Sequence, residues 1–262
     1  MWEIYLGGLG LIVVFMTILW IGSVILRNVS IVDAFWGLGL AGVTIYYFLM
    51  GEGDPFRKAL VLAMILLWGL RLSVYLFIRN AGKSEDIRYQ NFRKKYGGKN
   101  YWWISYFQTF LLQGTVMWMV SAPLLAAQTY EESYLFGVLD LVGLGIWIVG
   151  FLFESLGDAQ LFNFKRNPEN KGKILQTGLW KYTRHPNYFG ESLIWFGFGV
   201  MSISSGLVWP IVGTVIMVFI LIRVSGVRML DAVMLQSNPN YNLYIQRTSG
   251  FIPWKPKNPV GK

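Results

Sequence analysis

The chain contains no cysteine and only one histidine, His185, among its 262 residues. The absence of cysteine excludes disulfide bonds, thiolate nucleophiles and cysteine-ligated metals. One histidine cannot build a metal site of several histidines, so we expect no metal at the functional site. Charged residues are also scarce, at 14% of the chain. Soluble domains carry about 25%, so this composition is not that of an ordinary soluble protein.

Apolar residues are abundant instead. Hydrophobic residues make up 54% of the chain and aromatic residues 17%, and the mean hydropathy is +0.44. We therefore expect an integral membrane protein. No internal repeat is visible, so residues 1–262 are interpreted as a single membrane domain. The first apolar run has no basic region before it, which predicts a retained span and not a cleaved signal peptide.

Apolar stretches long enough to cross about 30 Å of hydrocarbon recur along the chain with short polar breaks. The predicted spans are 6–26, 31–50, 59–78, 105–128, 135–153, 188–204 and 207–224. The last two are predicted to form a hairpin with a short turn around 204–206. The expected fold is all-α, a polytopic membrane protein of about seven transmembrane helices.

Basic residues set the predicted orientation, because cytoplasmic loops carry an excess of Lys and Arg. Segment 79–99 holds seven and segment 165–184 holds six, and the C-terminal tail adds more. The opposite loops hold Arg57 and Lys58 or the acidic pair at 131–132. We expect the N-terminus outside and the C-terminus in the cytoplasm. The net charge of +9 then serves to bind membrane lipids or an anionic cofactor, and short loops on a membrane body argue against nucleic acid as a partner.

Ionisable residues inside predicted spans or at their ends are informative, because a charge within the membrane is costly and usually has a partner or a function. They are Asp33, Arg71, Glu154, Asp158 and Glu191. All five are predicted in the cytoplasmic half of the membrane, as the floor of a cavity open to the cytoplasm. The alternative is a set of structural ion pairs, of which Asp33 with Arg71 is the obvious one.

Segment 178–195, GLWKYTRHPNYFGESLIW, combines cationic, amide and acidic side chains at the start of an apolar run. Pro186 suits the first turn of a helix, whose free amides and positive dipole end favour an anion beside Arg184. A basic anchor that contacts lipid head groups is the alternative interpretation. Segment 79–101 is too charged to enter lipid, and it is interpreted as a solvated loop or as a lid over a cofactor site.

The run from Glu154 to Trp195 resembles the C-terminal half of steroid 5-alpha-reductases. The whole chain resembles the bacterial membrane family of unknown function that is classed with them. The second resemblance rests on five motifs: IVDAFWGLG, RLSVYLFIRN, SEDIRYQ, FLLQG and SGFIPW. It implies a C-terminal reductase-like region at about 135–262, a bacterial inner-membrane location, and NADPH as the cofactor. The implied reaction reduces a carbon–carbon double bond conjugated to a carbonyl in a lipophilic substrate.

The resemblance also implies the cofactor contacts, which lie in the second half of the chain. They are Glu154, Asp158, Lys165, Lys173, Tyr182, Asn187 and Glu191, together with Arg184, His185 and Tyr188 of the same stretch. Glu154 replaces an asparagine of the steroid enzymes. Lys165 and Lys173 replace arginines, which keeps the charge but loses the bidentate fork.

The groups that polarise the steroid ketone in those enzymes have no clear copies here. Asp33, near the start of the second span, and Trp68, Arg71 or Tyr75 on the third occupy roughly their places. Negative charge develops on the carbonyl oxygen during hydride addition, so a hydrogen-bond donor must meet it. We expect Tyr75 or Tyr89 to be that donor, and Asp33 to orient or recharge it.

Two other functions stay open. The stretch GLWKYTRHPNYFGE also resembles the RHPxYxG motif of integral-membrane methyltransferases for isoprenylcysteine and phospholipids, which bind S-adenosylmethionine. The cations Lys165, Arg166, Lys171 and Lys173 favour a dinucleotide instead. A transporter or lipid-binding scaffold would spread its intramembrane charges over both leaflets, whereas the predicted charges here lie in one.

Overall fold

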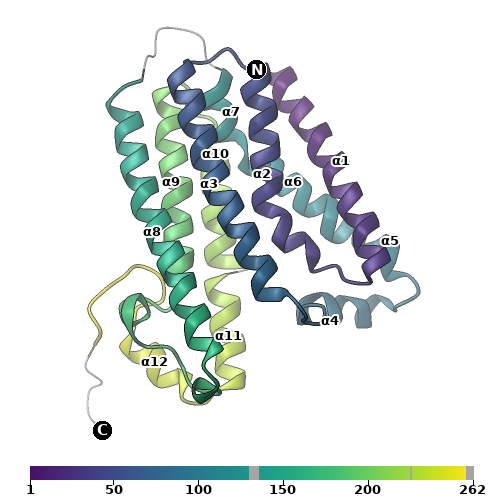
Figure 1. Ribbon diagram of the computed structural model, residues 1–262, viewed down its shortest axis with the longest axis vertical. Coiled ribbons are helices and arrows are strands. Elements are labelled where there is room, and N and C mark those ends of the chain that lie inside the picture. The colour runs from purple at the N-terminus through teal and green to yellow at the C-terminus, as the bar shows by residue number, and fades with distance from the viewer. Residues whose placement is uncertain (130–135, 225, 258–262) are drawn as a thin grey trace. The chain divides into compact units, whose positions relative to one another are not determined.

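The computed structural model describes residues 1–129, 136–224 and 226–257 (Figure 1). Helices dominate these ranges, and no strand occurs within them, which confirms the all-α prediction. The chain divides into two compact units. The first comprises Met1–Gly137 with Ser202–Gly213, and the second comprises Val138–Met201 with Thr214–Lys262. The prediction of one membrane domain stays a prediction.

Three long apolar helices build the first unit: α1 (Trp2–Leu26), α2 (Ile31–Met50) and α3 (Pro55–Asn80). Sequence chemistry sets the start of α3, because the Asp54 side chain accepts a hydrogen bond from the Arg57 amide and Pro55 occupies the first turn. Glycines let α2 and α3 approach closely. A Cβ atom on Gly37 would lie 2.4 Å from the carbonyl oxygen of Gly69, so neither position tolerates a side chain.

The charged segment 79–101 contains a helix, α4 (Ile87–Tyr96), where a solvated loop was one of the two expectations. Asp86 caps α4, since its side chain accepts from the Arg88 amide. Four elements follow: α5 (Tyr101–Ser105), a π-helical turn (Tyr106–Leu111), α6 (Leu112–Val120) and α7 (Ala122–Thr129). The predicted span 105–128 falls on these four elements, and it is a bent span if they cross the membrane together. The helix bends by 43° after Val120, where Pro123 removes a backbone donor.

The second unit contains the longest helix, α8 (Val138–Arg166). It continues thirteen residues beyond the predicted end at 153. Hydropathy predicts where a helix leaves the apolar part of the membrane, but the helix itself can continue through the polar residues that follow. Pro168 ends it by starting a short 3-10 turn, Pro168–Asn170. A second 3-10 turn, Gly178–Lys181, leads into α9 (Pro186–Ser204). The chain ends with α10 (Ile211–Phe219), a π-helical turn (Ile220–Val224), α11 (Val227–Ser237) and α12 (Tyr241–Arg247).

Glycines seven residues apart join α8 to α9. A Cβ atom on Gly150 would lie 2.6 Å from the oxygen of Gly190, and one on Gly197 would lie 2.6 Å from the oxygen of Gly143. Small residues at such spacing let two membrane helices pack backbone against backbone. Figure 1 shows the two helices running side by side over most of their length.

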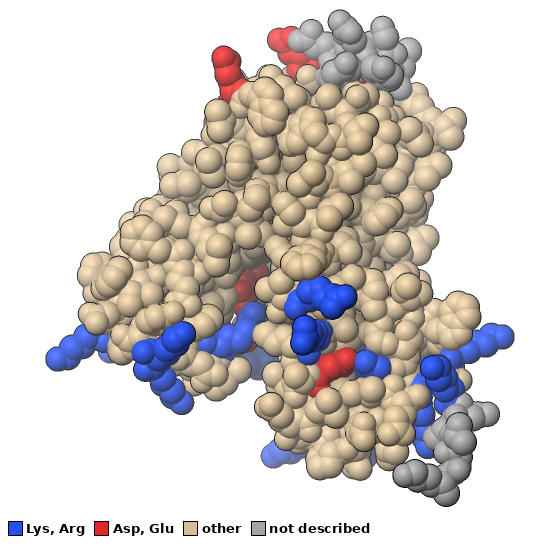
Figure 2. Space-filling model, turned by 180° about the vertical axis from the view of Figure 1, so that it is seen from behind, with Lys and Arg blue, Asp and Glu red and all other residues tan. Residues whose placement is uncertain are grey.

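Five helices are long and apolar enough to cross a membrane, or six if the bent pair Tyr101–Val120 and Ala122–Thr129 counts as one span. The protein is thus a multi-pass membrane protein, and Figure 2 shows that most of the surface on this face is neither acidic nor basic. The predicted count of seven stays a prediction, because α9 is not among these helices. The last predicted span starts at Ile211, not at 207, since turns occupy 205–210. Residues 131–132 and 135 lie outside the described ranges.

Candidate functional site

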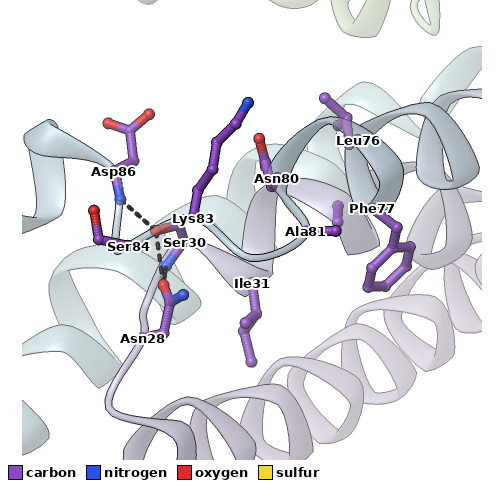
Figure 3. A pocket seen from close by; sticks show the side chains of 11 residues that line it. Asn28, Ser30, Ile31, Leu76, Phe77, Asn80, Ala81, Lys83, Ser84 and Asp86 are labelled. Carbon is purple, nitrogen blue, oxygen red and sulfur yellow. Dashed lines mark hydrogen bonds between the residues drawn. The ribbon is translucent and has the colours of Figure 1, made fainter.

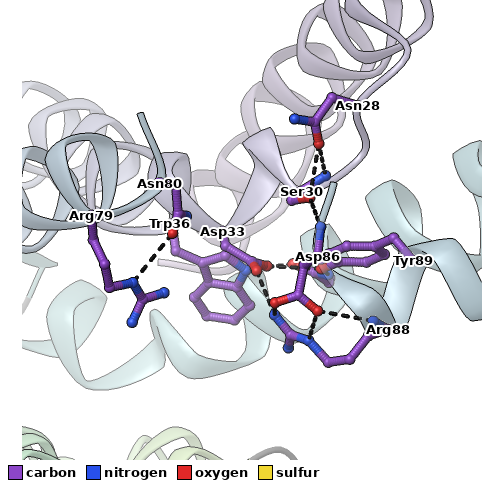
Figure 4. Close-up of polar contacts among 10 residues, drawn as sticks. Asn28, Ser30, Asp33, Trp36, Arg79, Asn80, Asp86, Arg88 and Tyr89 are labelled. Atoms are coloured by element: carbon purple, nitrogen blue, oxygen red, sulfur yellow. Dashed lines mark hydrogen bonds and ion pairs between the residues drawn. The ribbon is translucent and has the colours of Figure 1, made fainter. Parts of the chain in front are cut away.

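Asp33, in the first turn of α2, is the centre of a polar cluster in the first unit (Figure 4). Arg88 Nη2 lies 2.6 Å from Asp33 Oδ2, and the Tyr89 hydroxyl donates to Asp33 Oδ1 at 2.8 Å. Arg88 also pairs with Asp86 through its Nε atom at 2.9 Å. One carboxylate from a membrane helix is therefore held by two side chains of α4.

The cluster extends through the Tyr89 hydroxyl. Gln113 Nε2, on α6, donates to that hydroxyl at 3.2 Å, and Trp36 Nε1 donates to Gln113 Oε1 at 2.7 Å. Tyr89 is buried, with 4% of its surface exposed. A continuous chain of hydrogen bonds thus runs from Trp36 through Gln113 and Tyr89 to Asp33. We call these residues, together with Arg88 and Asp86, the Asp33 cluster.

Two further contacts fix α4 against the turn between α1 and α2. Glu85 Oε1 accepts from the Val29 amide at 2.8 Å and pairs with Arg93 Nη2 at 2.9 Å. The Asp86 amide donates to Ser30 Oγ at 2.7 Å. The segment 85–93 is therefore anchored through the Glu85 side chain and the Asp86 backbone amide, which explains how a charged stretch has a defined place beside a membrane helix.

Burial and charge set the protonation of the two α4 groups in the cluster. Burial raises the pKa of Tyr89, and the nearby Asp33 carboxylate raises it further, so the phenol keeps its proton at neutral pH. Burial alone would also raise the pKa of Asp86, but the hydrogen bonds and charge of Arg88 outweigh it and hold the pKa of Asp86 below its ordinary value. The cluster therefore presents a protonated phenol beside carboxylates that share one guanidinium.

The other predicted catalytic residues lie on α3. Arg71 and Tyr75 are half-buried and one turn apart. The Arg79 guanidinium lies 5.6 Å from the centre of the Tyr75 ring. Of the two tyrosines predicted as the donor, Tyr89 is the one that the structure joins to Asp33.

In the second unit, Arg184 and His185 converge on Asp231 of α11. Arg184 Nη2 lies 2.6 Å from Asp231 Oδ2, and His185 Nε2 lies 3.0 Å from Asp231 Oδ1. The Tyr241 hydroxyl donates to the same Oδ1 atom at 2.7 Å. Arg184 and His185 are buried, at 8% and 4% exposure. Both side chains therefore hold internal structure together.

The C-terminal motif 249–254 packs along the same stretch. The Thr183 hydroxyl donates to the Phe251 oxygen at 2.8 Å, and the Arg184 amide donates to the Ser249 oxygen at 2.9 Å. The Trp254 amide then donates to the Tyr182 oxygen at 2.9 Å. These backbone contacts bring together two motifs that lie about 70 residues apart in the sequence.

The remaining predicted cofactor contacts also lie in the second unit. Glu154 and Asp158 are buried on α8, and Asn187 Nδ2 donates to Asp158 Oδ1 at 3.2 Å. Tyr188 and Glu191 are half-buried on α9, and Tyr188 stacks on His185 with 5.8 Å between ring centres. The exposed residues are Lys165, Lys173 and Tyr182.

Sequence reasoning missed Asp231, Tyr241 and the role of Gln113. Asp231 carries a detectable signal, because it is the only acidic residue in the apolar run 211–237 and such residues usually have a partner or a function. Gln113 lies in the FLLQG motif, but nothing in the sequence points to Tyr89 as its partner.

Comparison with known proteins gives a family and several relatives. The profile of a family described as a protein of unknown function, DUF1295, matches residues 19–248. An uncharacterized protein of Schizosaccharomyces pombe is 25% identical over 276 residues, 95% of this chain and 79% of the relative. The 3-oxo-5-alpha-steroid 4-dehydrogenase 1 of Mus musculus is 33% identical over 92 residues, 35% of this chain and 34% of the enzyme.

A further relative is a very-long-chain enoyl-CoA reductase of Dictyostelium discoideum. It is 32% identical over 87 residues, 33% of this chain and 27% of the enzyme. The match therefore spans about a third or less of the length of each of these two reductases. No solved structure matches the chain.

Proposed function

The chain belongs to the DUF1295 family, and from its relation to steroid 5-alpha-reductases we propose that it is a membrane oxidoreductase that uses NADPH. The proposed reaction reduces a carbon–carbon double bond conjugated to a carbonyl group. The proposed substrate is lipophilic, either steroid-like or an enoyl thioester, since both kinds of reductase are relatives. Two of the relatives named above are a 3-oxo-5-alpha-steroid 4-dehydrogenase and an enoyl-CoA reductase, which favours this function over methyl transfer.

The observation that carries the proposal is the hydrogen bond from Tyr89 to Asp33 within the Asp33 cluster. Three of the sequence motifs meet in this cluster. Asp33 and Trp36 come from 31–39, Tyr89 comes from 84–90, and Gln113 comes from 110–114. Reduction of an enone needs a donor that faces the carbonyl oxygen as it gains negative charge. A protonated, fixed phenol suits that role.

Within this proposal, Tyr89 is the catalytic donor and its neighbours position it. Gln113 Nε2 donates to the phenol oxygen, so this contact uses the oxygen as an acceptor and does not occupy the phenol proton. Asp33 accepts that proton's hydrogen bond in the absence of substrate. Arg88 pairs with both Asp33 and Asp86 and so fixes the position of the two carboxyl groups. When substrate displaces Asp33 as the acceptor, the same phenol can donate to the substrate oxygen, and Asp33 stays near enough to help return a proton afterwards.

The side chains of the second unit suit NADPH in their chemistry. Buried carboxylates at Glu154 and Asp158, beside the amide of Asn187, can hydrogen bond to a carboxamide. Exposed cations at Lys165 and Lys173 can pair with phosphates. Bound NADPH would supply hydride. Arg184 and His185 are committed to Asp231, so we assign them to holding this stretch in place and not to direct phosphate contact.

The donor role is tested by turnover of Tyr89→Phe, which removes one oxygen atom. Oxidation of NADPH by purified protein would be followed with a steroid enone and with an enoyl thioester. Loss of a general acid typically costs a factor of about 100 to 10,000 in rate, and we expect kcat to fall within that range. Tyr96→Phe, the same change on the same helix outside the cluster, is the control and should keep its rate.

The pH profile sharpens this test. Because the pKa of Tyr89 is raised, the donor stays protonated well above its ordinary pKa of about 10. The wild-type rate should therefore show no loss from this group up to about pH 10. Equal rates for wild type and Tyr89→Phe would show that the phenol is not the donor.

Cofactor choice is tested by melting curves with and without nucleotide. NADPH should raise the melting temperature more than S-adenosylmethionine does. Lys165→Ala combined with Lys173→Ala should reduce the NADPH-induced rise in melting temperature. The binding free energy of NADPH should weaken by about 1.5 to 3 kcal/mol for each charge-assisted hydrogen bond that is removed. Lys255→Ala with Lys257→Ala removes the same charge elsewhere and is the control. A larger shift with S-adenosylmethionine would support a methyltransferase and overturn the proposal.

A further inference from the structure

A pocket of about 250 Å³ lies in the first unit (Figure 3). It shares Asp86 with the Asp33 cluster, but none of Trp36, Gln113, Tyr89 and Asp33 lines it. The start of α2 and the end of α3 form one side, and the turn 80–86 forms another. A pocket of this size has room for a small polar group such as a phosphate ester.

The polar side of the pocket is rich in hydrogen-bond donors. Asn28 Oδ1 accepts from both the amide and the hydroxyl of Ser30, at 3.0 and 2.8 Å. Asn80 Oδ1 accepts from Arg79 Nε at 3.3 Å. Both amide oxygens are thus occupied, which leaves the two NH₂ groups for a ligand. Ser84 and Lys83 complete the polar lining.

The charge balance around the pocket favours an anion. Lys83 is exposed, and among the described ranges no side chain forms an ion pair with it. Asp86 also lines the pocket, but its carboxylate is paired with Arg88. Counting Arg79, Lys83 and Arg88 against Asp33 and Asp86 leaves one positive charge in this region. Figure 3 shows the Lys83 side chain rising between Asn80 and Asp86.

The apolar side of the pocket belongs to two membrane helices. Ile31 and Ala34 come from α2, and Leu76 and Phe77 come from α3. Phe77 has 44% of its surface exposed, on a helix that is long and apolar enough to span a membrane. The polar lining comes from residues at or beyond the ends of these helices. A pocket with both apolar and hydrogen-bonding lining residues, at the ends of two helices that can span a membrane, has the mixed polarity of the membrane interface.

We propose that this pocket binds the phosphate head group of a membrane lipid. Lys83 supplies the cation, and Asn28, Asn80 and Ser84 supply hydrogen-bond donors, while the acyl chains lie outside along Phe77 on α3. Charge-assisted hydrogen bonds are the strongest that such a site can offer. The proposal concerns a ligand site separate from the proposed reaction, and it holds or fails independently of the reductase function.

The test measures lipid binding to the full chain in detergent by native mass spectrometry. The probes are dihexanoyl phosphatidylglycerol, uncharged dihexanoylglycerol and inorganic phosphate. Phosphatidylglycerol should bind more tightly than both others, because only it combines phosphate with acyl chains. Lys83→Gln should weaken its binding about tenfold, the effect of losing one charge-assisted hydrogen bond, and Lys83→Arg should restore it. Lys94→Gln removes an exposed charge on α4 outside the pocket and should have no effect.

Several outcomes would overturn the proposal. Equal binding of dihexanoylglycerol would show that the phosphate is not recognised, and equal binding of inorganic phosphate would show that the lipid is not. Unchanged binding in Lys83→Gln, or equal loss in Lys94→Gln, would mean that lipid associates without this pocket. Competition by NADPH that depends on Lys83 would instead assign the pocket to the cofactor. Melting curves of each variant without lipid establish that the fold is kept.

Discussion

At the scale of single residues, Asp231 makes more polar contacts than its place in an apolar helix suggests. Its carboxylate contacts the side chains of Arg184 and His185 and accepts a hydrogen bond from the Tyr241 hydroxyl. Arg184 in turn donates to the Thr248 oxygen at 2.6 Å, so one carboxylate ties α11 to the start of α9 and to the C-terminal segment. Removal of Asp231 would leave a buried guanidinium without its counter-charge.

We therefore expect Asp231→Ala to destabilise the protein by on the order of 3 kcal/mol, the usual cost of removing one partner of a buried ion pair. The measurement is thermal unfolding in detergent, together with hydrogen exchange of residues 182–184 and 248–254. Exchange should rise in both segments because their backbone hydrogen bonds depend on Arg184. Arg228→Gln, an exposed charge on the same helix, is the matched control. Wild-type melting of Asp231→Ala would contradict the structural role assigned to this carboxylate.

At the scale of elements, glycine positions decide how closely the helices of each unit approach. Gly143 and Gly150 on α8 face Gly197 and Gly190 on α9. The same pair of helices carries Asp158 and Asn187, whose side chains meet at 3.2 Å. The hydrogen bond needs the close approach, because a wider separation would move the two side chains out of reach.

Gly150→Ala should accordingly disturb this pair of helices. The added Cβ atom would meet the Gly190 oxygen at 2.6 Å and the Ile194 nitrogen at 2.7 Å, and overpacking of this kind costs about 1 to 3 kcal/mol. Melting in detergent measures the destabilisation, and the NADPH-induced shift should shrink with it. Gly145→Ala is the control on the same helix, since its Cβ atom would meet nothing within 4 Å. That variant should be neutral or slightly stabilised. Equal melting of the two variants would argue against close packing at Gly150.

At the scale of the whole molecule, the absence of cysteine makes the predicted orientation directly measurable. Single substitutions Glu52→Cys, Lys94→Cys and Lys255→Cys place one thiol at each of three exposed positions. With the N-terminus outside and the C-terminus in the cytoplasm, a membrane-impermeant maleimide should label only Glu52→Cys in intact cells. The other two should react only in inverted vesicles. The cysteine-free parent controls for background, and labelling of Lys94→Cys in intact cells would reverse the orientation.

The sequence by itself determined the class of the protein and most of its helices. Runs such as 31–50 are apolar enough to lie within lipid, where no water is present to hydrogen bond with the backbone. A helix forms because it pairs the backbone N–H and C=O groups within the same segment. Segments with mixed polarity were less predictable. The helix α8 continues to Arg166 and α4 forms within a charged stretch, because capping and contacts with neighbouring elements outweigh hydropathy there.

Only the tertiary structure decided which polar residues meet. The sequence singled out Asp33 and Arg184 at the edges of apolar runs and Tyr89 in a charged segment, and it named either Tyr75 or Tyr89 as the donor that Asp33 serves. It could not join Tyr89 to Gln113, or Arg184 to Asp231, because these partners lie 24 and 47 residues apart and belong to different helices. Hydropathy and residue spacing describe neighbours along the chain, whereas a hydrogen bond depends on the distance between two groups in space. Helix packing sets that distance, as in the close approach of α2 and α3 at Gly37 and Gly69.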